Sequence, residues 1–179
     1  KKKKLKFVFF SRIHPSKNLM RLVEIWKNNY FFKDYYLDIF GEVEDIKYFN
    51  KLKINIKNHK NVNYRGIIKN NLSKKLSKYD IFLHPSQSEN FGLVILEAMS
   101  CGLFPVVNKK IDWKILDKNN LGKSLNFNYK DLKKLTVRLN RSKKKIRSKK
   151  FNTKIRNFLS NHYNWKQIIN DYYKYYSNI

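Results

Sequence analysis

The sequence predicts an α/β domain built on a doubly wound parallel sheet. Two observations lead to this fold class. Short, almost wholly apolar runs recur along the chain, and segments of helix length with apolar residues at every third or fourth position separate them. Such runs fit strands that are buried on both faces, and the alternation fits parallel connections. Because ligands of these sheets bind beyond the carboxyl ends of the strands, functional residues are expected in the loops that follow them.

Six strands are expected. In order, they cover residues 5–10, 35–40, 61–64, 81–83, 104–107 and 124–127. The first run ends at Ser11, and Gly41 and Gly66 stop the second and third. The fourth run is wholly apolar, as a strand covered on both faces requires.

Amphipathic segments connect these strands. Expected helices cover residues 17–29, 45–57, 72–79 and 91–101. Ser16 is placed to cap the first of them, and Gly102 closes the last. From Asp131 onward the pattern is helical, through a lysine-rich helix to a final helix over 165–176. With 179 residues, 42% of them hydrophobic, and no repeat or linker, the chain is expected to form one domain over 1–179, with extra C-terminal helices over about 131–177.

The formal net charge of +27 has two explanations that remain open. One is a compositional bias toward A/T-rich codons, since Lys, Asn, Ile, Tyr and Phe are abundant while Arg and Ala are scarce. The other is a basic surface for nucleic acid, anionic lipid or a phosphate-bearing substrate. The lysine runs at 1–4 and 143–145 fall at or between elements, where we expect solvated linkers or, alternatively, contact with an anionic membrane.

Compartment and isolated reactive residues give weaker indications. Cys101 is the single cysteine, and this excludes an internal disulfide and indicates a reducing, cytoplasmic setting. We expect Cys101 to be an inert helix residue. No apolar run reaches the roughly 18 residues of a membrane span, so we expect a soluble protein, at most peripheral on the inner face of a membrane. His14 is expected in a loop, either solvated or touching a ligand, and His84 as a structural residue at a strand end.

Residues 80–107 carry the most chemical information. A strand ends at His84, a polar loop follows, and Gly92 opens a helix. The free N–H groups at a helix N-terminus form an anion site at the ligand-binding edge of the sheet. Glu89 lies in the loop and Glu97 inside the helix, at different depths along one crevice. Taken alone, each would be an ordinary surface acid, and neither suits a metal site without more ligands.

In this context Glu89 and Glu97 form an E-x7-E pattern that resembles the retaining glycosyltransferases of family 4, glycosyl transferases group 1. The resemblance implies the C-terminal, donor-binding half of a GT-B fold. Residues 9–18, with Arg12 and Lys17, resemble the strand-end loop in which this family holds the diphosphate of a nucleotide sugar. A guanidinium and an ammonium suit that group because they bind phosphate oxygens and offset the charge that develops on the leaving diphosphate.

The resemblance also implies the residue roles. Glu89, Arg12 and Lys17 are expected at the reacting end, and Glu97 on the ribose hydroxyls. Further donor-binding residues are expected to be Ser11, Asn90, Phe91, Gly92, Leu93 and Val94. No metal and no cofactor are implied. The chain departs from the family pattern at Ser11, after Gly41, and at residues 109–112, where paired glycines are usual.

The resemblance spans residues 6–177 but covers only the second of the family's two domains, so the N-terminal acceptor domain is absent from this sequence. The closing Tyr163-Asn164-Trp165 resembles the family's C-terminal helix.

The expected activity is transfer of a hexose from a nucleotide-diphosphate sugar to a glycan or lipid-linked acceptor, with little transfer by this chain alone. A fragment of a longer protein, a partner chain that supplies the other half, and a non-catalytic remnant are the alternatives. A nucleic-acid or anionic-membrane module is the rival class, although the lysines are spread through most of the expected helices and no base-stacking motif is visible.

Overall fold

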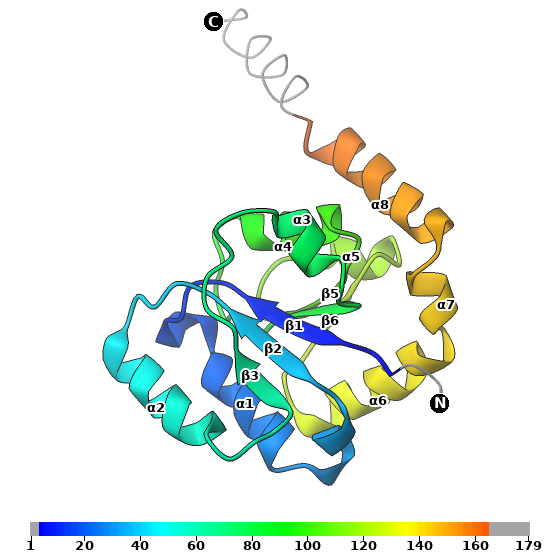
Figure 1. Cartoon of the computed structure of the whole chain (residues 1–179). Helices are drawn as coiled ribbons and strands as arrows, with labels where there is room; N and C mark the ends of the chain where they lie inside the picture. Colours follow the sequence, from blue (N-terminus) through cyan, green and yellow to red (C-terminus); the bar gives the residue numbers. More distant parts are fainter. Residues whose placement is uncertain (1–3, 165–179) are drawn as a thin grey trace, which may run out of the picture.

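The computed structural model describes residues 4–164, and its centre is a six-stranded parallel sheet in the order β3-β2-β1-β4-β5-β6. The strands are β1 (Phe7–Phe10), β2 (Leu37–Phe40), β3 (Val62–Tyr64), β4 (Ile81–His84), β5 (Phe104–Asn108) and β6 (Lys123–Leu125). The chain builds outward from β1 in one direction and then returns to add β4, β5 and β6 on the other side (Figure 1). This order confirms the predicted doubly wound α/β fold.

Helices flank the sheet on both sides (Figure 1). They are η1 (Pro15–Lys17), α1 (Leu19–Lys27), η2 (Tyr30–Asp34), α2 (Ile46–Ile56), α3 (Leu72–Leu76), α4 (Leu93–Ser100), α5 (Ile115–Lys118), α6 (Tyr129–Arg141), α7 (Lys143–Ile146) and α8 (Lys149–His162). Helix α1 packs on α2, whereas α8 lies along α4. Among residues 4–164, no helix combines the length and apolar character needed to cross a membrane.

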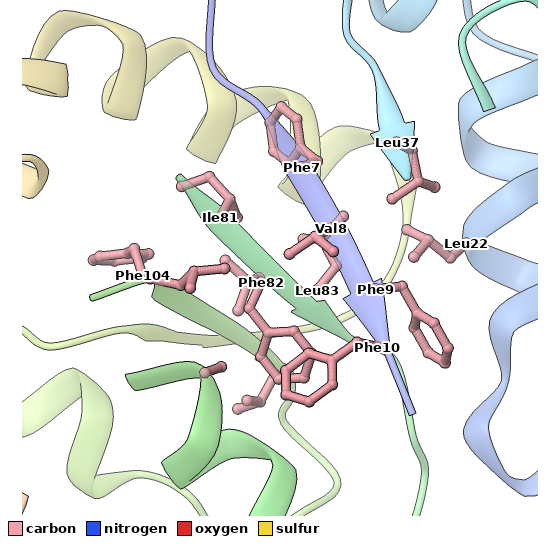
Figure 2. Close-up of a cluster of buried hydrophobic side chains, with 14 of the residues drawn as sticks. Phe7, Val8, Phe9, Phe10, Leu22, Leu37, Ile81, Phe82, Leu83 and Phe104 are labelled. Atoms are coloured by element: carbon pink, nitrogen blue, oxygen red, sulfur yellow. The ribbon is translucent and has the colours of Figure 1, made fainter. Parts of the chain in front are cut away.

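The core is centred on β1, whose four residues are all buried. Figure 2 shows Phe9 of β1 beside Leu22 of α1, and Phe10 beside Phe82 of β4. The Phe10 and Phe82 ring centroids lie 5.1 Å apart, and Phe7 meets Trp26 edge to face at 5.0 Å. Because β1 carries large apolar side chains on both faces, it takes the central place that the sequence pattern of a fully covered strand requires.

The start of α1 differs from the prediction. Ser16 does not cap this helix, because it lies within η1, where its N–H donates to His14 Nδ1 at 3.2 Å. Helix α1 begins after Asn18, which has a left-handed backbone (φ 52°) and no side-chain cap bond. Lys17, which was predicted to begin the helix, is instead the last residue of the 3-10 turn that precedes α1.

Several other boundaries also differ. Phe91 belongs to the loop, since α4 begins at Leu93 with Gly92 as its N-cap. Helices α5 and η2 were not predicted, because each covers only one or two turns and leaves too short a pattern to read. The helix expected over 165–176 lies outside the described residues.

Residues 143–145 are not a solvated linker but helix α7, attached to the amino edge of the sheet. The attachment point is Asp80, whose buried carboxylate accepts hydrogen bonds from Lys6 N (2.8 Å) and Arg147 Nε. Lys143 Nζ lies 4.0 Å from the same carboxylate and also donates to the Lys4 carbonyl. A buried carboxylate needs such partners, and α7 and its C-cap residue supply one each.

Candidate functional site

The strand order places the candidate site between β1 and β4. The chain leaves β1 toward β2 and leaves β4 toward β5, so the two following loops lie at the switch point on the carboxyl edge of the sheet, where this fold class binds its ligands. The first loop covers residues 11–18 and the second covers residues 85–92. The two loops contact each other, because Asn18 Nδ2 donates to the Pro85 carbonyl at 3.3 Å and Ser86 Oγ to the Ser16 carbonyl at 3.2 Å.

The loop after β1 is held by the loop after β2. Ile13 forms a parallel bridge with Val43, and its N–H donates to the Glu42 carbonyl at 2.7 Å. His14 then starts the 3-10 turn that ends at Lys17. Lys17 is buried, with 8% of its surface exposed, which is unusual for a lysine and requires a charged partner.

That partner is Glu89. Lys17 Nζ donates to Glu89 Oε1 at 2.6 Å, and both side chains are nearly buried. The structure thus brings together two of the three residues predicted at the reacting end, although they lie 72 positions apart in the sequence. Their meeting point is the switch point of the sheet, where this fold class binds its ligands.

A third residue, His84, completes the cluster. Its Nε2 lies 2.7 Å from Glu89 Oε1, the same oxygen that accepts from Lys17. Burial by itself would raise the Glu89 pKa, but the hydrogen bonds from His84 and Lys17 outweigh it and lower this pKa to about 2. Glu89 is therefore a carboxylate at neutral pH. Sequence reasoning missed this contact, and its only signal was the position of His84 at the end of an apolar strand.

The N-terminus of α4 lies directly after Glu89. Gly92, the N-cap, has a left-handed backbone (φ 75°), and α4 has no side-chain cap bond. The Ile95 N–H donates to the Gly92 carbonyl at 2.8 Å, whereas no capping side chain bonds the N–H groups of Leu93 and Val94, which leaves these two for a ligand or water. Phe91 and Leu93 are exposed beside them. Asn90 is also exposed and Val94 half-buried, so this predicted donor-binding segment lies at the surface of the domain.

Arg12 and Glu97 are not part of the Lys17–Glu89 contact. Arg12 Nη1 donates to Glu44 Oε1 at 2.5 Å, with both side chains largely exposed. Glu97 is exposed on α4 and has no ion-pair or hydrogen-bond partner for its carboxylate among residues 4–164, while partial burial raises its pKa. Ser11 lies at the loop entrance, where its N–H donates to the Phe40 carbonyl at 3.1 Å.

The loop after β5, where the sequence departs from the family pattern, is filled by Trp113. A Cβ at Gly92 would lie 2.9 Å from the indole Nε1, so the ring lies directly against the start of α4. Tyr163, after the end of α8, stacks on Trp113 with centroids 6.2 Å apart and meets Phe91 edge to face at 6.0 Å. Three distant segments thus meet beside Gly92, and this aromatic cluster was not predicted.

Metal ligands are not grouped in the described part of the chain. Among residues 4–164, no set of three His, Cys, Asp or Glu side chains is close enough to hold an ion. Glu89 is occupied by a lysine and a histidine, while Glu97 is alone. The cluster is therefore suited to bind and orient a polar or anionic ligand through Lys17 and the α4 N-terminus.

Solved structures with the same fold include two that are named as glycosyltransferases. HepE from Anabaena in complex with UDP has a TM-score of 0.81 at 18% identity, and the match covers 98% of this chain and 49% of HepE. The catalytic domain of the Helicobacter pylori cholesterol-α-glucosyltransferase has a TM-score of 0.63 at 21% identity, with 87% and 99% covered. The C-terminal domain of LpcC, a group 1 family protein from Francisella tularensis, has a TM-score of 0.67 at 20% identity, with 88% and 86% covered. The chain thus spans about half the length of HepE.

Sequence comparison gives the family. No curated protein matches the chain at a significant level. The sequence model described as "Glycosyl transferases group 1" matches residues 1–112, which is more than half of the 179 residues and includes the loop after β1 and the whole of α4. The chain therefore belongs to the glycosyl transferases group 1 family.

Proposed function

We propose that this chain is the donor-binding domain of a retaining, family 4 glycosyltransferase that uses a nucleotide-diphosphate sugar without a metal. The observation that carries the proposal is the buried Lys17–Glu89 pair at the switch point, next to the uncapped N-terminus of α4. A cation and free N–H groups on one crevice suit a diphosphate. HepE, which shares the fold, was crystallised with UDP and with UDP-glucose, and this supports a sugar nucleotide as the ligand.

In this proposal each residue binds a different part of the sugar donor. Lys17 turns from Glu89 to the diphosphate and offsets the charge that develops as the bond between sugar and phosphate breaks. Arg12 exchanges Glu44 for a phosphate oxygen, and the exposed position of their pair makes this exchange inexpensive. Glu89 then faces the donor sugar, and the N–H groups of residues 91–94 hold sugar hydroxyls and phosphate. Ser11 and Asn90 line the entrance.

The whole chain, 1–179, acts here as a single domain of a longer protein. The close fit to a structure described as the C-terminal domain of a group 1 family protein supports this assignment. The acceptor, a glycan or lipid-linked sugar, would bind mainly to an N-terminal domain that this sequence lacks. Consequently we expect the isolated chain to bind a sugar nucleotide in the cytoplasm but to transfer its hexose little or not at all.

The Glu97 carboxylate provides the test of the donor site. Because no group among residues 4–164 bonds to this carboxylate, replacing Glu97 with alanine should leave the fold stable but remove two charge-assisted hydrogen bonds to the ribose. We expect UDP to bind about 10- to 100-fold more weakly by calorimetry. Glu24→Ala, which removes a half-exposed acid from the middle of α1, is the matched control and should leave UDP affinity unchanged. If no UDP-, GDP- or ADP-sugar binds the unmodified chain, the proposal is wrong.

A second proposal is peripheral contact with an anionic membrane through the amino edge of the sheet. Lys4 and the lysine run at 143–145 meet there, because Lys143 donates to the Lys4 carbonyl. Lys4, Lys143 and Lys144 line a hollow of about 860 Å³ together with two further cations, Arg141 and Arg147. This edge is opposite to the candidate site, so a membrane bound there would leave the sugar-donor crevice free.

Reversing two of these charges tests the contact. Arg141→Glu with Lys144→Glu should weaken binding to phosphatidylglycerol vesicles by about tenfold or more, since each basic residue near such a surface contributes about 1 kcal/mol. Lys47→Glu with Lys51→Glu on α2 changes the net charge equally and should have a much smaller effect. Vesicle sedimentation at physiological salt measures both. Equal losses would mean that only net charge matters, and tight RNA binding without vesicle binding would favour the nucleic-acid module.

A further inference from the structure

The imidazole of His84 is held in a single orientation inside the domain. It is fully buried and its ring stacks on Phe82, with centroids 5.6 Å apart and planes inclined by 25°. Nε2 lies 2.7 Å from Glu89 Oε1. Nδ1 is buried and has no hydrogen-bond partner among residues 4–164. The two ring nitrogens therefore have very different environments.

These environments fix where the proton lies. The Glu89 carboxylate can only accept hydrogen bonds, so the short contact requires a proton on Nε2. His84 thus directs its Nε2–H at Glu89, beside the Lys17 ammonium that approaches the same oxygen.

A diphosphate would compete with Glu89 for Lys17. When the ammonium turns to phosphate, Glu89, whose side chain is only 11% exposed, loses a charged partner in a site where water cannot easily replace it. Without another donor, the carboxylate would either keep Lys17 or take up a proton. His84 is the other protein donor that reaches Glu89 among the described residues.

We infer that His84 is a positioning residue, whose Nε2–H keeps Glu89 charged and in place while Lys17 turns to the sugar donor's diphosphate. This inference rests on the proposed function for its second half, the exchange of Lys17. Its first half, the hold on Glu89, concerns the ligand-free domain alone. The two halves can be tested separately.

Few ionisable groups surround Glu89, so a change in its pKa can be assigned to the residue that was substituted. Lys17 from η1 and His84 from β4 are the charged or titratable side chains bonded to it. Arg12, from the same loop as Lys17, is paired with Glu44, and Lys110, from the loop after β5, reaches Gln87 at 3.5 Å.

Two amide variants differ by one methylene and separate positioning from packing. In His84→Gln the amide nitrogen can reach the place of Nε2, whereas in His84→Asn it reaches only that of Nδ1. Titration of the Glu89 carboxyl carbon by NMR in the ligand-free chain should show a pKa about one unit or more higher in H84N than in the unmodified protein, and little change in H84Q. H84L serves as a third variant if H84N fails to fold. An unchanged Glu89 pKa in every folded variant without the donor overturns the inference.

Calorimetry with UDP-glucose tests the exchange step. The unmodified chain and H84Q should bind without proton uptake, measured in two buffers that differ in ionisation enthalpy. H84N should take up roughly one proton per bound ligand, and its affinity should fall by up to about 100-fold between pH 6 and pH 8, because a protonated Glu89 favours the complex. Adding Glu89→Gln to H84N should abolish both effects. Binding by H84N without proton uptake overturns the exchange role. If the unmodified chain binds no sugar nucleotide, the proposed function and the exchange role fail together, while the titration still decides whether His84 holds Glu89.

Discussion

Under the proposed function, replacing Lys17 with methionine is expected to lower the rate of sugar transfer by the full-length enzyme by about 100- to 1000-fold. Methionine keeps the length of the side chain but removes the only buried cation beside Glu89 in the described part of the chain. The loss falls on the transition state, because the diphosphate carries most charge as it departs. On this chain alone, the same substitution should weaken UDP binding by about tenfold or more.

Transfer kinetics at saturating sugar nucleotide, with kcat and KM measured separately, check this expectation. Lys47→Met, on the exposed face of α2, is the matched control for the loss of one positive charge and should leave both constants unchanged. A variant at Lys17 that keeps its kcat within a factor of two or so would show that the lysine serves only to neutralise Glu89.

The largest effect on stability is expected for Gly41→Ala. A Cβ at Gly41 would lie 1.8 Å from the Ser11 carbonyl oxygen, a backbone atom that cannot simply rotate away. Both neighbouring strand ends are fixed, since the Gly41 N–H donates to the Gly66 carbonyl at 3.0 Å and Tyr64 Oη to the Gly41 carbonyl at 2.8 Å. Relieving the clash must therefore separate β1 from β2, at a cost on the order of 4 kcal/mol or more.

Urea unfolding of the two variants Gly41→Ala and Gly66→Ala measures this cost. At Gly66 the backbone is left-handed (φ 77°) but no atom lies within 4 Å of an added Cβ, so alanine there should cost only about 1–2 kcal/mol. Equal destabilisation of the two variants would contradict the prediction. The loop at residues 11–18 should also be displaced in Gly41→Ala, which would weaken UDP binding before the domain unfolds.

The fold could be predicted from the sequence because its strands are short, largely apolar runs that stand out from the segments between them. All six were predicted within one or two residues of their ends, since strands such as β4 are apolar on both faces and cannot be mistaken for amphipathic segments. The N-terminus of α4 could be placed for a similar reason, because Gly92 interrupts the pattern and permits the left-handed backbone that starts the helix. What failed locally was the capping of α1, where a 3-10 turn intervenes.

The candidate site was predicted only in part, because its pairings depend on contacts across the sheet. Lys17 and Glu89 were predicted in one pocket, but not as partners. Arg12 was expected in the same pocket, yet the bridge between Ile13 and Val43 brings Glu44 to it, and no local pattern announces that bridge. Its role on phosphate stays a prediction. His84 was interpreted as structural, since the sequence shows neither its burial nor the direction of its ring.

The switch point has a consequence for how the domain folds and responds to ligand. Lys17 belongs to the half of the chain that forms β1, β2 and β3, and Glu89 to the half that forms β4, β5 and β6. Neither half alone contains the cluster, so a partly folded chain in which only one half has formed offers no such cluster to a ligand. A sugar nucleotide that binds there must therefore stabilise the whole sheet against unfolding, and it raises the free energy of unfolding by RT ln(1 + [L]/Kd). Binding thus couples the two halves, so that they unfold together.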